Sequence, residues 1–62
     1  MNEPDPVFAI RRKTPNGNLY LTEDRRWTKH PTKALRTGNK HLIQKIHKSL
    51  PKESGGTIVR LI

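Results

Sequence analysis

The segment from Asn39 to Leu50 has the clearest alternation of apolar and polar positions in the chain. At about 100° per residue, its apolar residues share one stripe and its basic and polar residues the opposite arc. Asn39 is a candidate N-cap, because its side-chain oxygen can accept from a free first-turn amide. Pro51 ends the segment, since proline disfavours helical conformation in the residue before it. We therefore predict an amphipathic helix over 39–50. Its apolar stripe consists of Leu42, Ile43, Ile46 and Leu50.

Segments on both sides of this helix have the patterns of strands. Residues 7–13 and 19–22 predict two strands, and Asn16-Gly17 between them is a strong hairpin signal because both residue types tolerate positive φ. Residues 26–29 predict either a short third strand or an irregular continuation. Residues 57–62 are rich in β-branched side chains and predict a closing strand.

The order strand, strand, short strand, helix, strand predicts a small α+β domain over 7–62, after a disordered or extended lead-in over 1–6. The simplest packing is an antiparallel sheet with the helix across one face, and Trp27 belongs at the edge of that core. In the last strand, the choice between its two sets of alternating residues is nearly even, because Ile58 and Ile62 could replace Val59 and Leu61. The residues assigned to the helix side are Phe8, Ile10, Leu19, Leu21, Val59 and Leu61.

The outer face of the predicted sheet mixes basic and apolar side chains. Arg11, Lys13 and Arg60 would flank Tyr20 and form a basic patch that contains one aromatic residue. The apolar members indicate that this face is not fully solvated, and they could pair two copies into a weak homodimer. The apolar members are Val7, Ala9, Ile58 and Ile62, and Thr22 completes the face.

The charge of the chain points to an acidic partner. The 62 residues include 13 Lys and Arg but only 5 Asp and Glu, which gives a net charge of +8. Such a balance is typical of proteins that bind phosphate polyanions or acidic protein surfaces. The single Phe, Tyr and Trp argue against a stacking platform for single strands.

Composition also bounds the class and location of the protein. Only 31% of residues are hydrophobic and no cysteine is present, so a disulfide cannot support the small core. No apolar run approaches the length of a membrane span, and residues 1–6 do not resemble a signal peptide. We expect a cytoplasmic protein without membrane contact.

The sequence offers little for catalysis or metal binding. His41 and His47 lie about 240° apart around the predicted helix, and no cysteine could complete a metal site with His30. Glu23 and Asp24 fall in a polar turn, where solvent exposure leaves no desolvation to tune a pKa. We therefore expect neither an enzyme nor a cofactor.

Residues 20–28 have a recognisable order: Tyr-Leu-Thr, an acidic turn, then Trp-Thr, followed by an alanine-containing segment and a short helix. This pattern resembles small uncharacterised basic proteins of tailed phages and prophages over residues 7 to about 50. The resemblance implies a phage origin, and hence the host cytoplasm, rather than an activity. A more distant likeness is to the amino-terminal DNA-binding domains of phage-type integrases, which lay a three-stranded sheet into the major groove. This chain departs from them by placing a strand after the helix.

The sequence thus predicts a small basic phage-type protein that binds nucleic acid, DNA or RNA, mainly through phosphates. The alternative is a non-enzymatic inhibitor or adaptor that docks on an acidic host protein surface. Either the sheet face or the basic flank of the helix could form the contact. The candidate residues are Arg11, Arg12, Lys13, Tyr20, Arg25, Arg26, Lys40, Lys45, Lys48 and Arg60.

Overall fold

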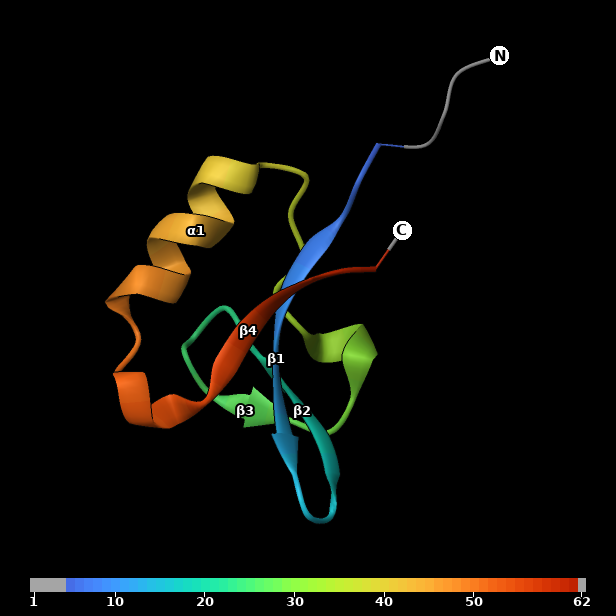
Figure 1. Ribbon diagram of the computed structural model, residues 1–62. Coiled ribbons are helices and arrows are strands. Elements are labelled where there is room, and N and C mark those ends of the chain that lie inside the picture. Colours follow the sequence, from blue (N-terminus) through green and yellow to red (C-terminus); the bar gives the residue numbers. More distant parts are fainter. Residues whose placement is uncertain (1–4, 62) are drawn as a thin grey trace.

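The computed structural model describes residues 5–61, which form the predicted α+β fold: a four-stranded antiparallel sheet with one helix packed against it (Figure 1). Part of the predicted lead-in, residues 1–4, and Ile62 lie outside the described residues. The strands lie in the order β3-β2-β1-β4. Their bounds are β1 Phe8–Thr14, β2 Gly17–Leu21, β3 Trp27–Thr28 and β4 Gly56–Arg60. The helix α1 spans Lys40–Ser49, and two short 3-10 turns are η1, Pro31–Lys33, and η2, Lys52–Ser54.

The β1–β2 hairpin forms where it was predicted, but by a different turn. Thr14 pairs with Gly17 around a two-residue loop of Pro15 and Asn16. In this turn Gly17 has positive φ, at 123°, whereas Asn16 does not. Proline suits the first central position of a common turn because its ring already fixes φ. The Thr14 hydroxyl donates to the Gly17 carbonyl at 2.7 Å and closes the turn.

Helix α1 begins and ends as its sequence predicts. The Asn39 side chain accepts from the Leu42 amide at 3.1 Å, so the predicted N-cap is confirmed. Ile43 and Ile46 are buried under the helix. Leu42 is a correction to the predicted stripe, because 43% of its surface is exposed. It lies on the flank of the stripe, where the sheet below does not reach it.

The core lies between α1 and the sheet. Ile58 lies opposite Ile10 in the β1–β4 register, so it faces the helix and packs against the core. Val59 lies opposite Ala9 on the outer face, and the predicted assignment of Val59 and Leu61 to the helix side is therefore wrong. The buried residues of this core are Ile10, Leu21, Ile43 and Ile46, with Phe8, Trp27, Leu35, Leu50 and Ile58 packed around them.

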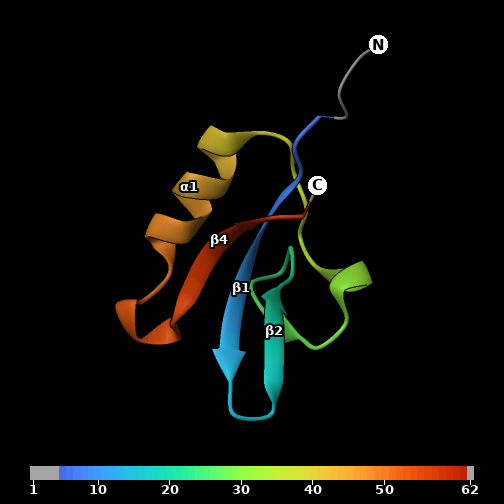
Figure 2. The same ribbon diagram turned by 45° about the vertical axis from the view of Figure 1, so that its right-hand side comes forward.

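The outer face of the sheet is partly covered by the chain that connects β3 to α1. The Leu35 amide donates to the Leu21 carbonyl at 2.8 Å, and Thr37 forms a bridge with Phe8, so this connection continues the line of β2 along β1. Turn η1 lies on the opposite side of the sheet from α1 (Figures 1 and 2). Ala9 is fully buried although it faces away from the helix.

The predicted apolar dimer face is not present as an open surface. Ile58 belongs to the core and Ala9 is buried, so neither is available on an open surface. Val7 is half-buried, and Ile62 lies outside the described residues. The four residues therefore do not form the continuous outer patch that the sequence suggested.

Among the described residues, no helix is long and apolar enough to cross a membrane.

Candidate nucleic-acid interface

Three of the candidate residues meet on the outer face of the sheet. Arg11 lies opposite Tyr20, and Lys13 follows two positions further along β1. Because alternate residues of a strand share a face, these three side chains lie on the side away from α1. Arg11 and Tyr20 are half-buried, while Lys13 is exposed. The Arg11 Nε is buried and has no hydrogen-bond partner among the described residues.

Arg60 does not belong to this group. It lies opposite Phe8 in the β1–β4 register, and Phe8 packs on the core side of the sheet. The predicted patch of Arg11, Lys13 and Arg60 around Tyr20 is therefore split between two faces. The cause is that β4 turns toward the helix the face opposite to the predicted one. In a strand, such a one-residue shift moves every side chain to the other face of the sheet.

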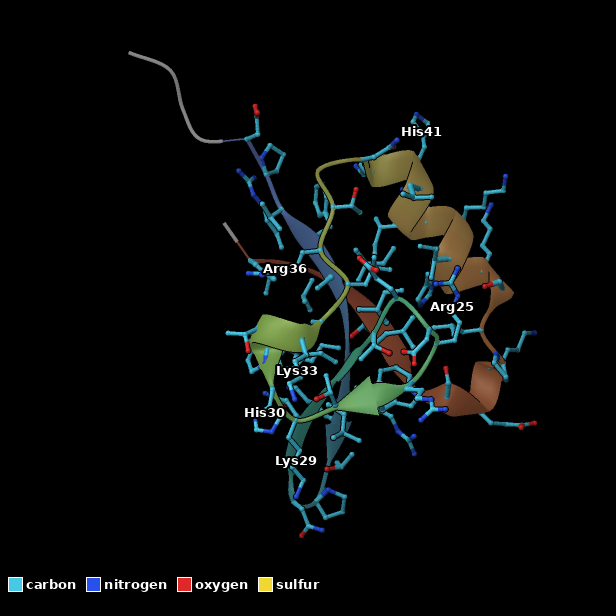
Figure 3. The ribbon with its side chains drawn as sticks, turned by 180° about the vertical axis from the view of Figure 1, so that it is seen from behind. Arg25, Lys29, His30, Lys33, Arg36 and His41 are labelled. Carbon is cyan, nitrogen blue, oxygen red and sulfur yellow. The ribbon has the colours of Figure 1, made fainter. Side chains whose placement is uncertain are left out.

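Basic residues of the β3–α1 connection lie on the same side as Arg11 and Lys13. Figure 3 shows Lys29, Lys33 and Arg36 on the η1 side of the molecule, away from α1. Arg36 precedes the Thr37 bridge and lines a shallow hollow with Val7 and Leu61 on the outer face. All three cationic side chains are exposed.

We call this whole group the outer basic surface. The contribution of the β3–α1 connection to this surface was not predicted, because that segment of the sequence lacks a regular period. The only available signal was the recurrence of basic residues at 29, 33 and 36. The members of the outer basic surface are Arg11, Lys13, Tyr20, Lys29, Lys33 and Arg36.

Two acidic residues border the outer basic surface. Glu23 and Asp24 line a hollow with Lys33 and Arg36, between the β2–β3 turn and η1. The Thr22 hydroxyl donates to the Asp24 carboxylate and lowers its pKa below the usual 3.8, with smaller contributions from a backbone amide and from Arg26. Asp24 is therefore negatively charged at neutral pH. The described strands carry no acidic residue on the outer face itself.

Three further candidates form local contacts away from this surface. The Arg12 guanidinium lies 5.8 Å from the centre of the Trp27 ring, on the core side of the sheet. Arg25 has φ of 66° and donates to the Glu23 carbonyl at 3.1 Å. The Arg26 Nε lies 3.4 Å from an Asp24 oxygen. Such an exposed ion pair is worth about 0–1 kcal/mol, so it does little to hold Arg26 away from a phosphate.

The helix lysines form a separate basic surface. Lys40, Lys45 and Lys48 are all exposed on α1, whereas the outer basic surface lies on the opposite side of the sheet. A rigid partner cannot contact both surfaces without surrounding the domain. The two alternatives that the sequence left open therefore correspond to two physically distinct faces.

The histidines occupy unrelated positions. His30 and His41 are exposed at different ends of the molecule (Figure 3), and the His47 Nε2 lies 2.8 Å from the Gly56 carbonyl oxygen. Within residues 5–61, no three His, Cys, Asp or Glu side chains are grouped closely enough to hold a metal ion.

Comparisons with known proteins give no indication of the function. No protein-family model matches the chain, and no significant match is found among curated proteins or solved structures. The resemblance to phage proteins, and the phage origin that it implies, therefore stay predictions. The function must be argued from the charges and surfaces of the chain itself.

Proposed function

We propose that the protein binds nucleic acid through phosphate contacts made by the outer basic surface. The observation that supports this assignment is the gathering of Arg11, Lys13, Lys29, Lys33 and Arg36 on one side of the sheet, with no acidic residue on the outer face of the strands. Neutralising phosphates releases counterions from the nucleic acid, and this release dominates the affinity of basic proteins.

The aromatic content favours backbone contacts over base stacking. Tyr20 is the one aromatic residue on the outer face among the described residues, and it is half-buried. Trp27 packs against the core on the other side. A single partly covered ring gives no platform for successive bases, so the affinity should be largely independent of sequence.

The salt dependence of binding tests the mechanism. With about four or five phosphate contacts, log affinity should fall against log salt with a slope of roughly −4. Between 50 and 200 mM salt, this slope corresponds to a loss on the order of a hundredfold. Fluorescence anisotropy with labelled DNA and RNA measures it directly. Absence of titratable binding at 50 mM salt and micromolar protein would refute the proposal.

Two charge-matched triple variants locate the site. One changes Lys13, Lys29 and Lys33 to glutamate, and the control changes the three lysines of α1 in the same way. Every substituted lysine is exposed, so both variants should fold, which circular dichroism checks. The first should abolish binding, and the control should reduce it only through net charge. Equal losses would mean that no defined surface is used. The α1 lysines are Lys40, Lys45 and Lys48.

An acidic protein partner would also show salt dependence, so the salt slope does not separate the two functions. A pull-down from lysate with and without nuclease does. Retention of a stoichiometric protein after nuclease treatment, with no direct binding to purified nucleic acid, would favour an inhibitor or adaptor that docks on an acidic protein.

A further inference from the structure

The two edges of the sheet differ in how they are protected. One edge is β3, which is only two residues long and follows Arg25 and Arg26 in the chain. Short, charged edges resist pairing with another chain. The other edge is β4, with five residues, and Gly56-Thr57-Ile58-Val59 contains neither a charge nor a proline. Figure 1 views the molecule from this side, and no other element crosses in front of β4.

The hydrogen-bond pattern shows which peptide groups of β4 face outward. The Leu61 amide donates to the Val7 carbonyl at 2.7 Å. Since bonded and non-bonded pairs alternate in an antiparallel ladder, Val59 and Thr57 also bond to β1. The amide and carbonyl of Ile58 therefore point away from β1. The Gly56 carbonyl points the same way and meets the His47 ring at 2.8 Å, whereas no described strand lies beyond Ile58.

We propose that β4 pairs with β4 of a second copy, antiparallel and centred on Ile58. In this register Ile58 faces Ile58 of the other copy, Thr57 faces Val59, and Gly56 faces Arg60. Thr57, Ile58 and Val59 are paired at the centre, the Gly56 carbonyl keeps its contact with His47, and each arginine meets a glycine rather than a like charge. A strand with this self-complementary order fits a second copy of the same chain better than an unrelated peptide.

This pairing joins two sheets into one of eight strands. Its two-fold axis is perpendicular to the sheet, so the outer basic surfaces of both copies face the same side. The interface uses the β4 edge and not the outer face, and it differs from the apolar patch that the sequence suggested. The proposal does not depend on nucleic-acid binding. The like charge of the copies, +8 each, predicts that salt strengthens association, the reverse of its effect on phosphate binding.

The absence of native cysteine allows a register-specific test by disulfide formation. Thr57 and Val59 of the other copy would form a non-hydrogen-bonded pair with Cα atoms about 4.5 Å apart, within the range of a disulfide. The two Thr57 Cα atoms, by contrast, would lie about 8 Å apart, one strand over and two residues along, which is beyond that range. The same separation applies to the two Val59 residues.

The experiment mixes equal amounts of Thr57→Cys and Val59→Cys protein under a mild oxidant. The mixture should give a covalent dimer of twice the 7.2 kDa chain mass, while each variant alone should stay largely monomeric. Circular dichroism confirms that both variants are folded. Sedimentation of the unmodified protein should show a dimer whose fraction increases between 50 and 500 mM salt. No excess cross-linking in the mixture, or cross-linking of Val59→Cys alone, would overturn the register. A monomer at millimolar concentration and high salt would overturn the dimer.

Discussion

Gly56 allows the Trp27 ring to lie across the sheet, and its replacement tests the packing of the core. A Cβ atom added at Gly56 would lie 2.9 Å from Cγ2 of Ile10 and 3.1 Å from Cη2 of Trp27. Both distances are shorter than an ordinary contact between carbon atoms, about 3.5–4.0 Å. The indole therefore reaches from β3 to the start of β4, and Gly56 leaves the space that it fills. We predict that Gly56→Ala destabilises the domain.

The size of the effect follows from two opposing contributions. Gly56 does not have positive φ, so alanine there avoids backbone strain and should gain about 0.4–1 kcal/mol by restricting the unfolded chain. Overpacking of a core site costs about 1–3 kcal/mol. The net loss should be about 1–2 kcal/mol. In a domain of this size, each kcal/mol lowers Tm by about 4–8 °C, so the change is measurable by circular dichroism.

A double-mutant cycle separates this clash from other causes. Trp27→Phe removes the outer ring of the indole and should relieve the contact with Cη2, while the contact with Ile10 stays, so the double variant should lose less stability than the sum of the single variants by about 1 kcal/mol. Gly55→Ala is the control. Gly55 has φ of 70°. The atom nearest to a Cβ added there is the Arg12 Cγ, at an ordinary contact distance of 3.8 Å. The stability lost in Gly55→Ala should come from backbone strain alone, and adding Trp27→Phe should not restore it. Strict additivity for Gly56→Ala would refute this account of the packing.

Two other predictions follow from burial and from the β2–β3 turn. Ile46→Ala should cost about 2–5 kcal/mol in urea unfolding because Ile46 is 7% exposed, while Leu42→Ala, at 43% exposed, should cost under about 1 kcal/mol. In an NMR titration the pKa of Asp24 should lie below 3.8, and Thr22→Val should raise it, because the hydroxyl is the largest cause of the shift. A lowered folded-state pKa stabilises the fold above pH 3.8, and this contribution is lost as pH falls through the folded-state value. An unchanged Asp24 pKa in Thr22→Val would contradict this role of the Thr22 hydroxyl.

The elements of the fold could be predicted from sequence because their signals are local. The period of the apolar residues and the Asn39 cap lie within α1 itself, and the hairpin signal lies within three residues of its turn. Even so, the turn formed around Pro15 and Asn16, because proline at the first central position outweighed the preference of Asn-Gly for positive φ.

The orientation of β4 could not be predicted because both of its faces are apolar. Ile58 and Val59 are both β-branched and differ little in hydrophobicity, so alternation alone does not choose between them. The choice depends on pairing with β1, more than forty residues earlier in the chain. Only one register sets Gly56 beneath the Trp27 ring, and that register also turns Ile58 toward the helix. Arg60 then follows to the same side.

The candidate site was only partly predictable for a related reason. With 13 basic residues among 62, every face of this domain carries cations, so their number cannot identify a binding surface. The surfaces differ in what accompanies the cations. Arg12 lies over Trp27, and the Arg25 and Arg26 side chains contact their own acidic turn. On the outer face, by contrast, Arg11 and Lys13 lie among strand positions without acids, and the Thr37 bridge brings Arg36 to the Phe8 end of the same strand. That bridge joins residues 29 positions apart, so no local sequence pattern indicates it. A count of charges therefore cannot identify the binding face, and the comparison of the two triple lysine variants decides it.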